Sequence, residues 1–327
     1  MRKARAFVLA ALVVGATDLA RAQESAGTPL INRIRYATLA APDVDAAAAW
    51  YTRFLGYRII DVGKVDTDLA ASWGAPKTAG RTYTVMVSPA NRDVGVRVVA
   101  ADPVPGADAD TTFGWGGLEI IVQDTYKVHE AMKAGGVEIV RAPASLGAPF
   151  ASIHAMQVKG PIGEIIALTT ETGDPATSNL PVPQAPIDRI FLVGVSGPRI
   201  DALRDFYLTT FKMRPGPVFD GPSPRRAKAL GLPATEVFPM TLVRSAERGN
   251  TIELHALPAP AKARPRADGQ LPPGVAIVSF GVASLDIAGV AYLTPPASRP
   301  KAGYGGARAA TFIGPAGELI EFIEERR

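Results

Sequence analysis

A repeated phrase constrains the fold of this chain more than any other feature of its sequence. GPIGEIIALTTE at 160–171 returns as GPAGELIEFIEE at 314–325, and WYTRFLGYRI at 50–59 returns in looser form as FYLTTFKMRP at 206–215. The two matches are offset by 154 and 156 residues. Two matches at nearly equal offsets indicate an internal duplication, so we expect the chain to fold as repeated units.

Each half of the chain also divides into two units of one kind. In the first half, a strand precedes a helix predicted at 44–55, and strand-like runs follow; the pattern then restarts, with a second helix predicted at 125–136. The helix of the last quarter is weak, because LDIAGVAYL is short and contains a glycine. The sequence therefore predicts an α+β fold of four βαβββ units, paired into two domains.

The predicted domain boundaries follow from the segment between the halves. TGDPATSNLPVPQAP at 172–186 contains four prolines and no hydrophobic period, which is typical of a linker. The first domain is expected at 31–171 and the second at 187–327.

The first residues are typical of an export signal. Three basic residues open the chain, an apolar run covers 6–16, and an A-x-A pattern stands at 20–22. The apolar run is too short to cross a bilayer, which takes about 20 residues. We therefore expect residues 1–22 to be a cleaved signal peptide and the mature protein to be periplasmic or secreted, with no membrane segment.

Charge and cysteine content narrow the classes of partner. The whole chain carries a formal charge of +4, of which residues 1–22 supply +3, so the mature part is close to neutral. No basic stripe favours nucleic-acid binding, and the basic stretches at 222–231 and 262–269 are interpreted as solvated loops. Cysteine is absent, which excludes disulfides, thiolate metal sites and a cysteine nucleophile.

The repeated phrases resemble those of a known superfamily. APDVDAAAAWYTRFLGYRI at 41–59, GGVEIV at 135–140 and the two GPxGE phrases resemble the vicinal oxygen chelate superfamily, which includes glyoxalase I, bleomycin-resistance proteins and extradiol dioxygenases. The resemblance runs from about residue 31 to the C-terminus. It implies that paired units curl into half-open β-barrels whose concave faces bind a small molecule, often through a divalent metal.

The resemblance also implies where metal ligands would stand, on the first and last strands of each unit. In the first half these positions fall at Tyr36, near Val98, near Gly117 and at Ala167, so that half departs from the pattern. In the second half Glu253 and Glu321 stand at last-strand positions. His255 shares a strand face with Glu253, because strand side chains alternate. Those three residues are the predicted ligands of one divalent ion (Fe, Mn, Zn or Ni), and the two glutamates are the predicted catalytic residues.

Several further side chains are predicted to line the ligand cavities. Glu119 and Tyr36 are expected to point inward, and two tryptophans in glycine-rich loops are placed where an aromatic ring closes over a ligand. For each of these residues a purely structural role is the competing interpretation. The full set of predicted substrate-binding residues is Tyr36, Trp73, Trp115, Glu119, His154 and Ser279.

The sequence supports two functional hypotheses. In the first, the second domain is a metal-dependent lyase or isomerase acting on a small oxygen-bearing molecule. In the second, the protein binds such a molecule without metal and without catalysis. Both describe a monomer or homodimer whose partner is a small molecule, and the sequence does not name the substrate.

Overall fold

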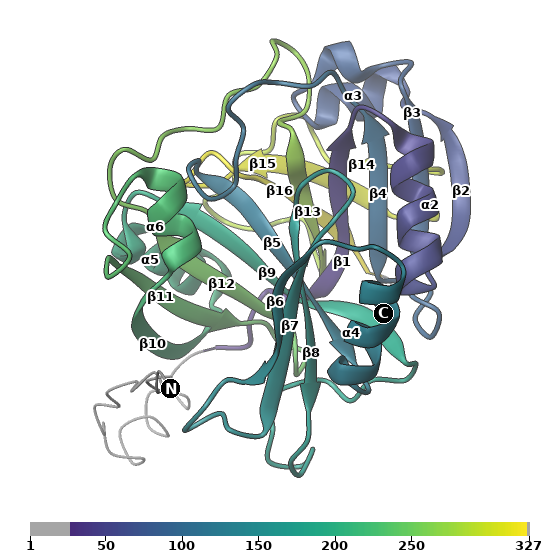
Figure 1. Cartoon of the computed structure of the whole chain (residues 1–327). Helices are drawn as coiled ribbons and strands as arrows, with labels where there is room; N and C mark the ends of the chain where they lie inside the picture. The colour runs from purple at the N-terminus through teal and green to yellow at the C-terminus, as the bar shows by residue number, and fades with distance from the viewer. Residues whose placement is uncertain (1–26, 326–327) are drawn as a thin grey trace, which may run out of the picture.

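A computed structural model describes residues 27–325 of the chain, so the expected signal peptide at 1–22 lies outside the described residues. The chain forms four units in sequence, each led by a long strand (Figure 1). Unit 1 contains β1 (Ile31–Ala41), α2 (Val44–Leu55), β2 (Arg58–Lys64), α3 (Thr67–Ser72), the 3-10 turn η1 (Pro76–Thr78), β3 (Thr82–Val87) and β4 (Gly95–Ala100). Unit 2 contains β5 (Gly114–Val122), α4 (Thr125–Ala134), β6 (Ile139–Ser145), β7 (Ile153–Lys159) and β8 (Ile165–Glu171).

The second half repeats this order, except for the helix that follows the leading strand of its last unit. Unit 3 contains β9 (Ile187–Gly197), α5 (Ile200–Phe211), β10 (Arg214–Pro222), α6 (Pro224–Leu230), β11 (Val237–Arg244) and β12 (Thr251–Ala256). Unit 4 contains β13 (Gly274–Val282), β14 (Ala297–Ser298), β15 (Arg308–Ile313) and β16 (Leu319–Glu324). Between β13 and β14, residues that the structure describes throughout, the chain has no helix.

The leading helix shows how local sequence sets these boundaries. The Asp43 side chain accepts a hydrogen bond from the backbone N–H of Ala46, which satisfies a free donor at the start of α2. Gly56 ends the helix in the left-handed conformation, with φ of 67°, which glycine adopts without steric cost. The buried positions Ala47, Tyr51 and Leu55 lie on one face at helical spacing.

The units pair into two eight-stranded sheets, which confirms the predicted α+β fold of two curled half-barrels. Sheet I has the strand order β14-β15-β16-β13-β1-β4-β3-β2, and sheet II has the order β10-β11-β12-β9-β5-β8-β7-β6. Units 1 and 4 therefore share sheet I, and units 2 and 3 share sheet II. The expected partition into continuous ranges, 31–171 and 187–327, does not describe these sheets, since each one takes one unit from each half.

The pairing is set by antiparallel contacts between leading strands. In sheet I, β1 pairs with β13 and places Tyr36 opposite Ser279. In sheet II, β5 pairs with β9 and places Gly117 opposite Gly194. The linker 172–186 joins β8 to β9 and so connects the two units of sheet II directly.

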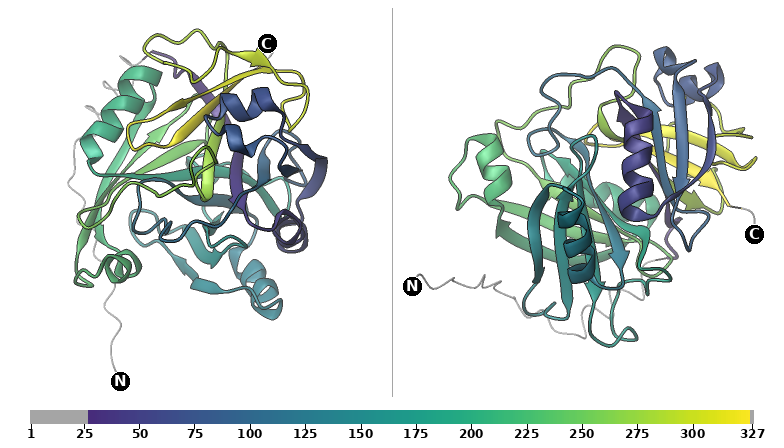
Figure 2. Two further views of the ribbon diagram at one scale, coloured as in Figure 1. Left: turned by 90° about the horizontal axis from the view of Figure 1, so that it is seen from above. Right: turned by 45° about the vertical axis from the view of Figure 1, so that its right-hand side comes forward.

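One apolar core joins the two sheets. It contains residues from the outer faces of both sheets together with the buried faces of the helices. Each long helix packs on strands of its own unit: α2 on β3 and β4, α4 on β6 to β8, and α5 on β11 and β12 (Figure 2). The concave faces of the sheets point away from this shared core.

The two duplicated phrases of the sequence contact each other in space. The hydroxyl of Tyr51, from α2, donates to the Glu164 carboxylate of the first GPxGE turn at 2.8 Å. Tyr207, from α5, donates in the same way to Glu318 of the second turn at 2.9 Å. Each contact joins consecutive units that belong to different sheets. The repeated motifs therefore hold sheet I and sheet II together.

No helix among the described residues is long and apolar enough to cross a membrane.

Candidate functional site

The concave face of sheet II holds a cavity of about 310 Å³. Its floor is formed by the central strands β5, β8, β9 and β12. Two carboxylates face it from different units: Glu119, which lies beside Ala167 in the β5–β8 register, and Glu253, which lies beside Gly194 in the β9–β12 register. Because Ala167 and Gly194 are small, these strand positions leave the centre of the cavity open.

Glu119 is the more weakly acidic of the two carboxyls. Burial raises its pKa to about 7, and the negative charge of Glu253 adds to the effect. The Thr169 hydroxyl donates a hydrogen bond to Oε1 of Glu119, which opposes the rise. A carboxyl with this pKa exchanges its proton near neutral pH.

Glu253 is held ionised by its neighbours. Burial acts to raise its pKa, but His255 and Arg226 more than offset this and hold the pKa below its usual value. Nη1 of Arg226 lies 2.8 Å from Nδ1 of His255, and Nε2 of His255 lies 3.0 Å from Oε2 of Glu253. Arginine only donates hydrogen bonds, so Nδ1 accepts and Nε2 carries the proton that is donated to Glu253.

His255 is neutral in this arrangement. Burial lowers its pKa, and the positive charge of Arg226 lowers it further. Both ring nitrogens are engaged, one by Arg226 and one by Glu253. His255 therefore orients Glu253 and fixes which of its oxygens is free.

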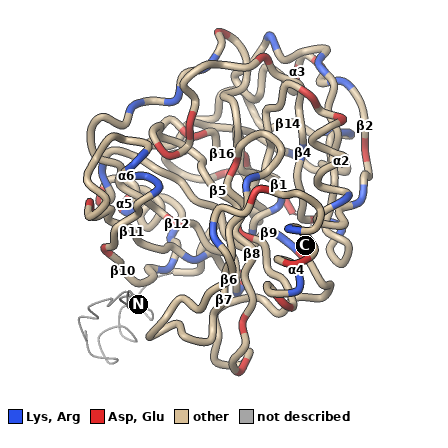
Figure 3. The backbone as a smooth tube through the Cα atoms, in the orientation of Figure 1, with Lys and Arg blue, Asp and Glu red and all other residues tan. Residues whose placement is uncertain are grey.

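Helix α6 positions Arg226, which corrects the interpretation of 222–231 as a solvated basic loop. The stretch contains α6, along which Figure 3 colours the positions of Lys and Arg blue. Arg225 and Arg226 both contact Asp110, with Nε of Arg226 3.8 Å from Oδ1 of Asp110. Asp110 belongs to the connection between units 1 and 2, so this ion-pair cluster covers the rim of the cavity.

The predicted metal ligands do not come together. Glu253 and His255 lie in sheet II, whereas Glu321 lies in sheet I on β16. Within residues 27–325, no group of three or more histidine, aspartate and glutamate side chains is placed to hold a metal ion. The sheet II residues do not fit a metal centre as they stand, since His255 has no free nitrogen and Arg226 adds a positive charge beside it.

Glu321 instead meets three other predicted residues inside sheet I. Tyr36, Trp73, Ser279 and Glu321 are each no more than 1% exposed. Glu321 accepts hydrogen bonds from Nε1 of Trp73 at 2.9 Å and from the Ser279 hydroxyl at 2.5 Å. This cluster is closed to solvent, so these residues do not line an open ligand site.

Trp115 and His154 lie away from the concave site. His154 projects from the other face of β7, where its Nδ1 contacts the Tyr126 hydroxyl at 2.8 Å. Trp115 is 1% exposed and donates from Nε1 to the carbonyl of Leu319 at 2.8 Å.

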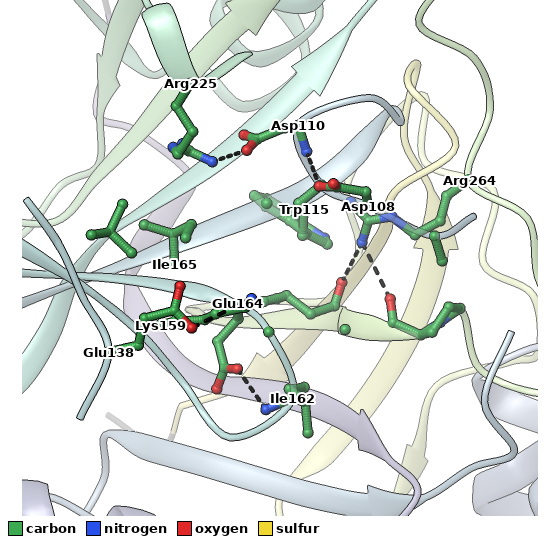
Figure 4. Close-up of a pocket in the computed structure, with 18 of the residues that line it drawn as sticks. Asp108, Asp110, Trp115, Glu138, Lys159, Ile162, Glu164, Ile165, Arg225 and Arg264 are labelled. Atoms are coloured by element: carbon green, nitrogen blue, oxygen red, sulfur yellow. Dashed lines mark hydrogen bonds and ion pairs between the residues drawn. The ribbon is translucent and has the colours of Figure 1, made fainter. Parts of the chain in front are cut away.

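Trp115 also borders a second cavity of about 560 Å³ between the two sheets (Figure 4). Arg264 and the Asp110–Arg225 ion pair line this second cavity as well. Asp110 and Arg225 border both cavities, so the ion pair stands at the boundary between them.

Sequence reasoning missed two arginines of these clusters. Arg97 was overlooked because the inward last-strand position was placed at Val98, one residue away, and neighbouring strand residues face opposite sides. A signal was present, since Arg97 is a lone charge in the apolar strand VGVRVVA. Arg226 gave no comparable signal, because a basic residue in a short helix is usually solvated.

Comparisons with known proteins agree with this geometry. Residues 33–166 match the model of the Glyoxalase/Bleomycin resistance protein/Dioxygenase superfamily. Over these residues, the chain is similar to the superfamily that the repeated phrases resemble. A comparison with curated proteins gave no match.

Solved structures extend the likeness to the whole fold. A glyoxalase I mutant (V278E) from Zea mays is 15% identical with a TM-score of 0.59, and the alignment covers 95% of this chain and 97% of that one. A putative dioxygenase from Bacillus subtilis is 13% identical with a TM-score of 0.59, covering 92% and 87%. At these identities the likeness concerns the fold, and the chemistry has to be argued from the residues of this chain.

Proposed function

We propose that sheet II binds a small oxygen-bearing molecule and transfers a proton to and from it, with Glu119 as the acid–base residue. The observation that carries this proposal is the pair of carboxyls facing one cavity with pKa values displaced in opposite directions. A pair of titratable groups separated in this way is the pattern expected of acid–base catalysis. It suits a reaction of the isomerase or lyase class that begins with proton abstraction beside a carbonyl.

The two carboxyls have different roles. Glu119, with a pKa of about 7, both accepts and donates a proton near neutral pH. Oε1 of Glu119 accepts a hydrogen bond from Thr169, which leaves Oε2 for the substrate. Glu253 remains ionised and fixed by His255, so it acts as an electrostatic and hydrogen-bonding group. The Arg141 guanidinium and the Gln157 amide also line the cavity and supply donors for substrate oxygens.

The proposal is tested by proton exchange, which needs no knowledge of the natural substrate. Hydroxyacetone and dihydroxyacetone are incubated with the protein in D₂O, and deuterium incorporation beside the carbonyl is followed by NMR. We expect exchange above the buffer rate, and a loss of about 10²–10⁴-fold in Glu119→Gln. The matched control is Glu130→Gln, because Glu130 makes the same charge change on the exposed surface of α4.

The alternative is a binding protein without catalysis, which the donors Arg141 and Gln157 also suit. Saturable binding of the probes by calorimetry without any deuterium exchange would establish that alternative. Unchanged exchange in Glu119→Gln would contradict the assignment of Glu119. A divalent metal bound in stoichiometric amount, and lost in Glu253→Ala, would restore the metal-dependent hypothesis.

Export belongs to the proposal as well. It depends on residues 1–22, which lie outside the described part of the chain. We expect the full-length protein in the periplasmic or secreted fraction, with its N-terminus at Gln23, and the chain without residues 1–22 in the cytoplasm. Cell fractionation and N-terminal sequencing check both.

A further inference from the structure

Arg97 is buried at the centre of sheet I. It projects inward from β4, is 0% exposed, and is paired in the strand register with Thr38. Its Nη1 donates to the Thr38 hydroxyl at 2.9 Å and lies 3.5 Å from Oε2 of Glu321. Its Nε donates to the carbonyl of Ala302 at 3.0 Å. A charge buried this deeply is tolerated only when it is paired and hydrogen-bonded.

Three aromatic rings surround the guanidinium. Its central carbon lies 5.5 Å from the ring centroid of Tyr36, 5.4 Å from that of Trp73 and 4.5 Å from that of Tyr304. Aromatic faces attract cations at these distances, and a desolvated contact is stronger than an exposed one. With the Glu321 carboxylate, the rings form an enclosure that suits a flat monovalent cation.

Two segments close this enclosure. Trp73, which directly follows helix α3, donates to Glu321, and the segment 299–307 places Ala302 and Tyr304 over the barrel. Tyr304 also donates its hydroxyl to Glu321, so the same carboxylate fixes both closing segments. An apolar cluster fills the remaining interior of sheet I.

The duplication shows what has changed between the sheets. Arg97 stands 156 residues before Glu253, which is the offset that relates the helical motifs of the two halves. Sheet II therefore has a carboxylate facing an open cavity where sheet I has a guanidinium. At two further matched positions, sheet I carries Ser279 in place of Glu119 and Glu321 in place of Ala167.

We propose that sheet I is a cation-binding enclosure occupied by the chain's own Arg97, so that this side chain acts as a permanent ligand. The class of ligand is a planar guanidinium-type cation that meets one carboxylate and three aromatic rings. The occupied enclosure holds α3 and the segment 299–307 in place. It thereby makes sheet I a stability element and leaves ligand binding to sheet II.

Chemical rescue tests this proposal. Arg97→Ala removes the cation and leaves the Glu321 carboxylate buried without its charge partner, so its Tm is expected to fall by on the order of 10 °C. Millimolar ethylguanidinium chloride is expected to return at least half of that loss, with a saturating dependence on concentration. Equal concentrations of sodium chloride and tetramethylammonium chloride are the salt and cation controls. Arg81→Ala, which removes a partly exposed arginine paired with Asp102, is the variant control.

Several results of the rescue experiment would overturn the proposal. Rescue that is absent, that is not saturable, or that appears equally in Arg81→Ala overturns the proposal. Stronger rescue by Zn²⁺ or Mn²⁺ than by ethylguanidinium also overturns it, because the enclosure would then prefer a metal ion. If Arg97→Ala does not fold, the yield of soluble protein refolded with and without ethylguanidinium gives the same comparison.

A second variant keeps the test independent of cavity formation. Glu321→Gln preserves the shape of the cluster but removes its negative charge, leaving the guanidinium unpaired. We expect a Tm loss comparable with that of Arg97→Ala and no rescue by ethylguanidinium. A Tm within about 2 °C of the wild type would show that Arg97 only fills space.

Discussion

The two sheets of this protein are built from the same strand plan and have opposite interiors. Sheet II presents Glu119 and Glu253 to an open cavity, and small residues lie beside them. Sheet I presents Arg97 and Glu321 to each other and is filled by aromatic rings. A few inward positions therefore decide whether the interior of such a barrel is an open cavity or is filled by paired and aromatic side chains. The strand framework alone does not decide it.

The largest expected difference between the two sheets concerns their last-strand glutamates, Glu321 and Glu253. We expect Glu321→Ala to lower the free energy of unfolding by about 3–5 kcal/mol, because it leaves the buried Arg97 charge unpaired. Glu253→Ala is expected to cost less than about 1 kcal/mol, since Glu253 faces a cavity and 27% of its side chain is exposed. Urea unfolding of both variants measures the two changes in the free energy of unfolding. Equal losses would show that the sheets do not differ in this respect.

The next effect is the pH dependence of stability, which arises from two buried glutamates at the contacts between the sheets. Burial raises the pKa of Glu164 and of Glu318 to about 7. Because both values lie above the ordinary value of 4.5, the folded state favours the neutral carboxyls. Their stabilising contribution is full below about pH 4.5 and is lost as the pH rises through 7.

Each carboxyl is expected to change the free energy of unfolding by on the order of 2–3 kcal/mol over that range. Thermal unfolding between pH 4.5 and 8 measures the slope. Glu164→Gln should flatten it, whereas Glu130→Gln, on the exposed surface, should leave it unchanged. An unaltered slope in Glu164→Gln would contradict the raised pKa.

A smaller effect compares the two halves at matched contacts. Tyr51→Phe and Tyr207→Phe each remove one hydroxyl that donates to a buried glutamate, and each should cost about 1–2 kcal/mol. Nearly equal losses, measured by urea unfolding, are expected because the two contacts are the same duplicated motif. A loss in only one variant would show that the halves have diverged here too.

The smallest effect concerns Glu119, the proposed acid–base residue of sheet II. Thr169→Val removes the hydrogen bond that holds the pKa of Glu119 down, so that pKa should rise by less than about one unit. If Glu119 acts as a base, the deuterium-exchange rate rises with pH through about 7 in the wild type and through a higher pH in the variant. An unshifted pH profile would remove Glu119 from the proton transfer.

Much of the fold could be predicted from the sequence, because helices and turns carry local signals. The helix predicted at 44–55 matches α2, and the GPxGE phrases are the turns before β8 and β16. The pairing of units could not be predicted, since the repeats show which segments are alike but not which strand edges meet. Because the pairing was not predicted, Glu253 and Glu321 were expected in one metal site. The observed pairing puts them in different sheets.

The candidate site was predictable in part for a related reason. The family resemblance placed Glu253 at an inward strand position, and the resemblance together with strand alternation placed Glu119 inward. The structure shows both facing one cavity. The role of His255 depended on Arg226, which arrives from a helix in the same unit and has no fixed sequence distance from the site. Arg97 was missed through a one-residue error in strand position, which reverses the face of every side chain.

The pairing of the first unit with the last has a consequence for how the chain is made. Sheet II has all its strands once synthesis has passed Ala256, whereas β1 cannot meet β13 until residues 274–282 exist. In the interval the inner edge of β1 has no partner, and an open strand edge is a template for aggregation. The barrel with the candidate site is thus able to form first, and a chaperone requirement would fall on the nascent first unit.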